Sequence, residues 1–249
     1  MSSLNISLIT LGFLLGGVLL GMRLQGLLPN NHLSKESQDT VKLGAGMVAT
    51  MTALILGLLV SSAKSSFDAM NIALAQNSAK IIQLDYLLAD YGPEAQPLRL
   101  ELKQELAQRV ELIWSQRGGL HSVEKVTAML DFQTGLRKLT PANDLQKSIL
   151  AEAQRVSTDI WQTRLIMIEQ QQTPVSPVLL VLLVFWLTLL FTSFGLFAPR
   201  NLTVSAVLFV CALSVASAVF LILEMSHPLS GHIKASSAPL VKALELIGH

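Results

Sequence analysis

One face of an apolar helix carries the residues whose types and spacing best suit the passage or binding of a small ion. Small and hydroxyl-bearing residues recur there at steps of four, three, four and four: Gly46, Thr50, Ala53, Gly57 and Ser61. This spacing places them on one face, which leads to Lys64. If copies of the helix surround a pathway, the hydroxyls of Thr50 and Ser61 line it. Leu54 or Leu58 then forms an apolar constriction. Alternatively, the small residues only let another helix pack closely, and the spacing fits both interpretations.

Ionisable residues flank the apolar stretches of the chain and none lies in the middle of one. Four of them stand at the ends of these stretches: Arg23, Lys64, Arg200 and Glu224. A charge at such a position usually serves as a solvated anchor, and we expect this of all four. A proton-coupled pump would need an ionisable group inside the apolar region, so that class is disfavoured.

The histidines and the known catalytic motifs give no case for a metal centre or an enzyme. The histidines have no carboxylate or thiolate at ligand spacing: His32, His121, His227, His232 and His249. The chain also lacks a G-x-S-x-G turn, a phosphate-binding glycine loop and an H-E-x-x-H helix. We therefore expect no catalytic residue, no metal site and no cofactor.

Four long stretches without Asp, Glu, Lys or Arg must position these residues: Ile6 to Met22, Leu43 to Ala63, Val178 to Ala198 and Leu202 to Leu223. Each approaches or exceeds the roughly 20 residues with which a helix crosses a bilayer. The composition agrees, with 51% hydrophobic and 14% charged residues and a mean hydropathy of +0.52. The sequence therefore predicts an all-α integral membrane protein with four transmembrane helices in two pairs.

A long polar segment with helical periodicity separates the two pairs. Its apolar spacing predicts that the second helix continues from Leu43 to Asp90, roughly 70 Å. Three further helices are predicted at Glu94 to Gln116, His121 to Leu139 and Pro141 to Gln172, with Pro141 in the first turn of the last. The expected organisation is a first transmembrane pair (1–64), an extramembrane helical bundle (65–173), a second pair (174–224) and a C-terminal turn with a short helix (225–249).

Charge limits the partners and bears on the orientation. The net charge of +1, without a basic stripe, argues against nucleic acid and leaves the lipid bilayer as the expected environment. The short loops opposite the bundle carry Arg23, Lys35, Lys42 and Arg200. By the positive-inside rule this slight excess would place the bundle outside the cell.

Five blocks of sequence, spread over nearly the whole chain, resemble the bestrophin-like family of bacterial membrane proteins. They read LPNNHLSKES (28–37), LGLLVSSAKSSFD (56–68), DYGPEA (90–95), FGLFAPRN (194–201) and FLILEMSHPLSGHIKASSAPL (220–240). The last block holds the turn residues shared with the family: Glu224, Pro228, Ser230 and Gly231. It departs from the family at Ser226 and His227, where an Asp-Arg pair is typical. The alternative to a functional role is a structural one. In that case the turn folds a C-terminal helix, Ala238 to Ile247, back against the bundle.

The resemblance implies a function that the residue pattern alone does not give. Bestrophins assemble as pentamers, with the second transmembrane helix of each subunit around an anion pathway and the helical domain in the cytoplasm. By that analogy we expect a homo-oligomer in the bacterial inner membrane that conducts inorganic anions, with a cytoplasmic bundle despite the charge count. The alternative is a membrane scaffold or sensor whose bundle binds a protein through an apolar patch at Leu112, Ile113 and Trp114.

Overall fold

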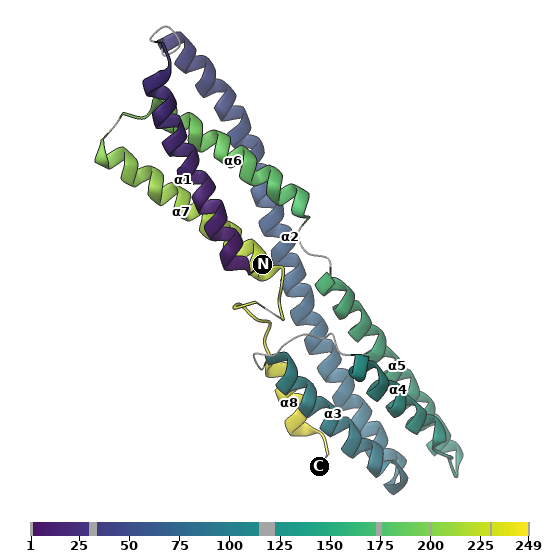
Figure 1. Cartoon of the computed structure of the whole chain (residues 1–249). Coiled ribbons are helices and arrows are strands. Elements are labelled where there is room, and N and C mark those ends of the chain that lie inside the picture. The colour runs from purple at the N-terminus through teal and green to yellow at the C-terminus, as the bar shows by residue number, and fades with distance from the viewer. Residues whose placement is uncertain are drawn as a thin grey trace. The chain divides into compact units, whose positions relative to one another are not determined.

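The fold was analysed in a computed structural model of the 249-residue chain. The structure describes residues 2–29, 34–114, 123–172, 176–199, 201–229 and 231–248, without the side chains of 112–114, 123–130 and 170–172. The described residues form α-helices, one 3-10 turn and connecting segments, with no β-strand among them. Figure 1 labels the helices: α1 (Ser3–Leu27), α2 (Lys35–Tyr91), α3 (Gln96–Trp114), α4 (Val123–Lys138), α5 (Asp144–Gln172), α6 (Pro177–Phe197), α7 (Leu202–Met225) and α8 (Ala238–Leu246).

Four of these helices, α1, α2, α6 and α7, are long and apolar enough to cross a membrane. Each corresponds to one of the charge-free stretches of the sequence, although α6 ends one residue before its stretch does, at Phe197. The longest is α2, which runs for 57 residues without interruption. It begins eight residues before the predicted start at Leu43 and ends at Tyr91, where Gly92 adopts a φ of 125° that favours glycine.

The chain divides into two compact units, and the first holds residues 1–65 and 174–226. Its core is formed by α1, α6 and α7 together with a few residues of α2: Leu14, Val18, Leu59, Ala63, Leu183, Leu187, Phe191, Ala212, Val219, Ile222 and Leu223. Helices α1 and α6 approach each other through glycines. A Cβ on Gly21 would overlap the carbonyl oxygen of Thr192, and one on Gly195 would overlap that of Val18. Small residues therefore bring these two backbones into contact.

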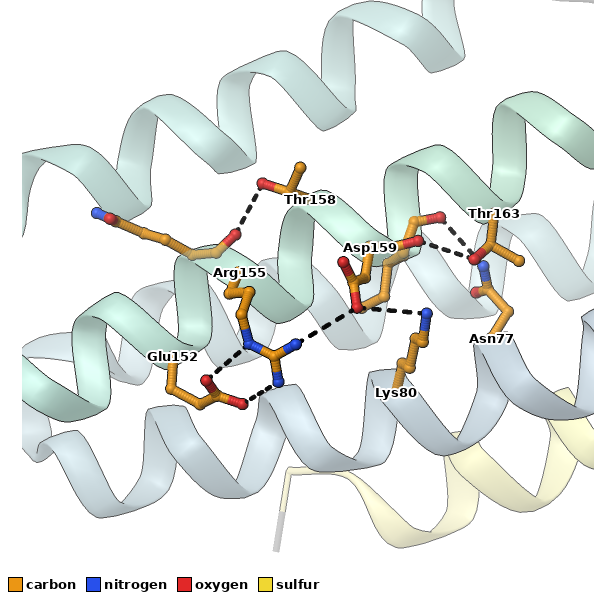
Figure 2. A network of polar contacts seen from close by, with 9 residues as sticks. Asn77, Lys80, Glu152, Arg155, Thr158, Asp159 and Thr163 are labelled. Atoms are coloured by element: carbon orange, nitrogen blue, oxygen red, sulfur yellow. Dashed lines mark hydrogen bonds and ion pairs between the residues drawn. The ribbon is translucent and has the colours of Figure 1, made fainter.

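The second unit, residues 66–173 and 227–249, is a helical bundle. The C-terminal half of α2 contributes Met70, Leu74, Ile81, Leu84 and Leu88 to its core. The other core residues come mainly from α3, α4, α5 and α8, whose buried faces include Leu106, Phe132, Ile160, Leu240 and Ala243. Polar contacts also join α2 to α5. Figure 2 shows Asp159 between Arg155 of the same helix and Lys80 of α2, whose Nζ lies 3.5 Å from the Asp159 carboxylate.

The predicted start of α5 at Pro141 was wrong. The helix begins at Asp144, and Asn143 caps it by accepting the backbone N–H of Gln146 at 2.7 Å. Gln146 completes a reciprocal cap because its Oε1 accepts the backbone N–H of Ala142. These side chains satisfy amides at the end of the helix, so Pro141 lies in the segment before it.

The segment after α7 contains a turn, as the sequence predicts. Within the second unit, the Gly231 N–H donates to the carbonyl of His227 at 3.0 Å, and the Ala235 N–H donates to that of Pro228 at 2.7 Å. The Asn71 side chain of α2 accepts the backbone N–H of Ser236. Helix α8 follows and buries Leu240 and Ala243 in the bundle.

Candidate functional site: the exposed face of α2

The residues predicted to line a pathway lie on a face of α2 that its own chain does not cover. All of them are exposed: Gly46, Thr50, Ala53, Leu54, Gly57, Leu58, Ser61 and Lys64. The Cα positions of Gly46 and Gly57 face open space, since a Cβ added to either would meet nothing within 4 Å. We call Gly46, Thr50, Ala53, Gly57, Ser61 and Lys64 the small-residue face.

The buried side of α2 lies on a different part of the helix surface. Thr52, Leu59 and Ala63 are buried, and Leu59 and Ala63 belong to the core of the first unit. At about 100° per residue, Ala63 lies a quarter turn or more from Lys64, which follows it directly. The small-residue face is therefore not the face by which α2 packs within its own subunit.

Other glycines of the same unit show what glycine does when it serves packing. Gly17, Gly21 and Gly195 are buried at the contact of α1 with α6, and a Cβ on Gly17 would lie 2.9 Å from the Thr188 carbonyl oxygen. Gly46 and Gly57 have no comparable neighbour within the subunit. Their lack of a side chain therefore serves a contact or a space outside the subunit's own core.

The two hydroxyls of the small-residue face, those of Thr50 and Ser61, differ in whether they can donate a hydrogen bond to a bound group. The Thr50 hydroxyl donates to the carbonyl of Gly46, one turn earlier, at 2.9 Å, so it presents mainly acceptor capacity to its surroundings. Within the described part of the chain, the Ser61 hydroxyl makes no hydrogen bond and remains available as a donor. The donors at this end of the face are the Ser61 hydroxyl and the ammonium of Lys64, which also interacts with another group of the chain.

The apolar candidates lie beside this face. Leu54 and Leu58 are 65% and 70% exposed, and each follows a small residue directly, so it lies about 100° around the helix from it. Such side chains stand at the edge of the small-residue face and are large enough to narrow a space in front of it.

The structure adds residues to the site that sequence reasoning did not single out. An open groove of about 570 Å³ runs between the start of the small-residue face and the facing ends of α6 and α7, where Phe194, Phe197 and Leu208 line it. Lys42 lies at the same groove. The sequence could have revealed Lys42, because it lies four residues before Gly46 and so continues the spacing of the small-residue face. With Lys42 included, the face has a lysine at each end.

The other residues that the sequence singled out are partly described by the structure, and one of them differs from its prediction. Glu224 is 1% exposed, so its prediction as a solvated anchor was wrong, and it interacts with other groups of the folded chain. A buried carboxylate without such interactions would be costly. Ser230, Arg200 and the side chains of the Leu112 to Trp114 patch lie outside the described residues. Among the residues that the structure does describe, no group of three His, Cys, Asp or Glu could hold a metal ion.

The helices and the exposed face define an all-helical membrane protein whose second helix is only partly enclosed by its own chain. A family model, that of the bestrophin-like domain, matches residues 12–240. The chain belongs to this family, as the sequence blocks indicate.

Solved structures show the same fold. A mutant of a bacterial bestrophin homologue from Klebsiella pneumoniae superposes with a TM-score of 0.66 at 12% identity, covering 95% of this chain and 97% of that one. A second mutant of that homologue gives a TM-score of 0.64 at 13% identity, with 95% and 96% covered. A search of curated protein sequences found no match. At these identities the likeness shows the fold, while the family model shows the membership.

Proposed function

We propose that the chain forms a homo-oligomeric ion channel of the bacterial inner membrane, with the small-residue faces of α2 from several subunits around a central pathway. Membership of the bestrophin-like family supports this class of activity, because the resemblance to bestrophins implies an anion pathway. Pentameric assembly, by analogy with bestrophins, is part of the proposal. The two pairs of helices span the bilayer, and the bundle between them lies outside it on the cytoplasmic side.

One observation carries the proposal. The small-residue face is exposed along its whole length, although it lies on a membrane-capable helix whose other side is partly buried. The glycines that serve packing in this unit are elsewhere, at the contact of α1 with α6. A conducting pathway between subunits gives the open face of α2 a role that packing within the subunit does not.

The chemistry of the face supports a preference for anions. Ser61 and Lys64 provide a hydroxyl donor and a positive charge at one end, where Lys64 also interacts with another group of the chain. Lys42, whose Nζ lies 3.7 Å from the carboxylate of Asp39, provides a second positive charge at the other end. No acidic residue interrupts the helix between Lys42 and Lys64. Leu54 and Leu58 form the apolar constriction between the two ends.

The test is ion flux through the purified full-length protein in liposomes, with chloride compared with potassium. The Gly57→Leu variant puts a large side chain into the pathway. Its matched control is Gly44→Leu on the same helix. Gly44 also faces open space, but it lies two residues from Gly46 and hence about 200° around the helix.

We expect wild type and Gly44→Leu to conduct chloride and Gly57→Leu to lose most of the flux at unchanged expression. Equal flux in all three proteins would contradict the assignment of the pathway to the small-residue face. If Gly57→Leu fails to assemble but its residual protein conducts normally, the face serves packing between subunits. No flux from wild type at any pH, calcium concentration or voltage would favour a scaffold or sensor whose bundle binds a protein.

A further inference from the structure

Two arginines inside the helical bundle share one carboxylate. Arg109 and Glu105 lie one turn apart on α3, and Arg109 Nη2 is 2.7 Å from Glu105 Oε1. Arg164 of α5 reaches the same oxygen, with its Nη1 at 3.0 Å. The cluster thus joins α3 to α5 through a single acceptor atom.

The cluster is buried and its hydrogen bonding is incomplete. Arg164 is 4% exposed and Arg109 is 9% exposed. The Nε–H groups of both arginines are buried and meet no acceptor. Nearly all buried polar groups in proteins are hydrogen-bonded, and an exception needs an explanation such as local strain, a catalytic role, or a bound water or ion. Two unsatisfied donors in one cluster therefore need an explanation.

The net charge of Arg109, Arg164 and Glu105 gives the sign of the missing partner. Two guanidinium groups and one carboxylate leave an excess of one positive charge. Among the described residues, neither arginine has a second acidic group at ion-pair distance. Glu101 lies one turn before Glu105, and burial and the charges of Glu105 and Asp131 raise its pKa; it forms no ion pair with either arginine among the described residues.

Protonation does not remove the excess at neutral pH. Burial and the charge of Arg109 lower the pKa of Arg164 to about 10, against the attraction of Glu105, so its guanidinium remains charged at pH 7. An uncompensated buried charge costs several kcal/mol. A water molecule would accept from an Nε–H, but it would leave the charge unbalanced.

We propose that the bundle binds one small inorganic monoanion, of the size of chloride, between Arg109 and Arg164. A single negative charge makes the cluster neutral, and a spherical anion accepts from both Nε–H groups. A cavity of about 10 Å³ lies beside Arg109 and is lined by apolar residues, among them Leu106, Phe132 and Ile160, but not by Arg164. This volume corresponds to about one water-sized occupant on the Arg109 side of the cluster. The anion serves to hold α3 and α5 together.

This site is independent of the proposed conducting pathway. It lies in the bundle, among residues of the second unit only, and its occupancy requires no flux. A protein that conducts nothing could still hold the anion, and a channel could lack it. Thermal stability therefore tests it separately from conduction.

The first experiment measures the Tm of full-length protein in detergent at constant ionic strength, in sodium chloride and in sodium gluconate. Three proteins are compared: wild type, Arg164→Met and Arg155→Met. Arg155 is the matched control, because it lies on the same helix in ion pairs but is exposed. Arg164→Met leaves the neutral pair of Glu105 with Arg109 and removes the need for an anion.

Chloride at one hundred times its dissociation constant should raise the Tm of wild type and Arg155→Met by roughly 5–10 °C. The Tm of Arg164→Met should not depend on the anion. An equal chloride effect in all three proteins, or none in wild type, would overturn the proposal.

A second pair of measurements does not depend on the folding of Arg164→Met. Glu105→Gln raises the excess charge to two, so its Tm should depend on chloride more steeply than that of wild type. Crystals of wild type grown in bromide should show an anomalous peak within hydrogen-bond distance of both Nε atoms. A smaller chloride dependence in Glu105→Gln, or a well-ordered bundle without that peak, would show that the cluster binds no anion.

Discussion

The guanidinium of Arg99 on α3 binds both carboxylate oxygens of Asp85 on α2. The Nε–Oδ1 distance is 2.9 Å and the Nη2–Oδ2 distance is 2.8 Å, and both side chains are buried. The Gly248 N–H donates to the same Oδ2 at 3.1 Å. One carboxylate thus fastens two helices and the C-terminal residues of the bundle.

Replacing this carboxylate should destabilise the bundle strongly. Asp85→Asn breaks the buried ion pair with Arg99, and breaking such a pair by replacing one partner typically costs about 3–5 kcal/mol. We expect a clear fall in the Tm of the bundle. Asp159→Asn is the control, since the ion pairs of Asp159 with Lys80 and Arg155 are partly exposed and contribute only about 0–1 kcal/mol. A similar fall in Tm in both variants would show that the buried pair of Asp85 with Arg99 stabilises the bundle no more than the exposed pairs of Asp159 do.

The glycine contact of α1 with α6 should be intolerant of any large side chain. Gly21→Leu places atoms where the Thr192 carbonyl lies, so the two helices must separate, at a cost of about 3 kcal/mol or more. Size-exclusion chromatography should show little folded protein. Gly16→Leu, on the same helix but facing open space, should elute as wild type does. A well-folded Gly21→Leu protein would mean that α1 and α6 do not meet at this glycine.

Lys64 should control the selectivity of the proposed channel. Lys64→Gln removes the positive charge at one end of the small-residue face, and Lys64→Glu reverses it. The ratio of chloride to potassium permeability, from reversal potentials in planar bilayers, should fall several-fold in the first and below unity in the second. Lys80→Gln, whose ammonium pairs with Asp159 in the bundle, should leave the ratio unchanged. An unaltered ratio in Lys64→Glu would place the selective part of the pathway elsewhere.

Glu101 should make bundle stability depend on pH. Partial burial and the charges of Glu105 and Asp131 raise its pKa above the ordinary 4.5. The folded state therefore binds this proton more tightly than the unfolded state, and stability declines as the pH rises through that interval. Glu101→Gln removes the repulsion and should stabilise the protein by about 0.2–0.5 kcal/mol at pH 7.

The advantage of Glu101→Gln should be complete above the raised pKa of Glu101. It should vanish as the pH falls below 4.5, where the wild-type side chain is protonated in both states. Tm measurements on the two proteins between pH 4 and 8 provide the comparison. A constant difference over that range would show that the effect of the substitution is not electrostatic.

The helices themselves could be predicted because hydropathy and apolar periodicity are properties of neighbouring residues. The charge-free stretches gave α1, α6, α7 and the first half of α2, and the spacing of Met70, Leu74 and Ile81 indicated that α2 continues. The start of α5 was missed because Pro141 and Asn143 both suit a helix beginning. Only the contacts of the Gln146 side chain with its neighbours decide between them.

The candidate site could be predicted only in part. Periodicity shows that Gly46 and Gly57 share a face, but it does not show which way that face points. That direction depends on how other helices cover α2, which is a tertiary property. The pairing of Glu105 with Arg164, 59 residues apart, could not be anticipated either, because nothing in the local sequence links α3 to α5.

The single cysteine of the chain offers a way to count subunits. Cys211 lies on α7 as a free and exposed thiol, and the sequence contains no other. Because Cys211 lies in the middle of a membrane-capable helix, a membrane-permeant maleimide dye is needed to label it. One dye per polypeptide then requires no engineering, and the photobleaching steps of a single labelled particle report how many copies it contains. A thiol that reacts in dissociated protein but is protected in the intact particle would further identify α7 as part of the boundary between copies.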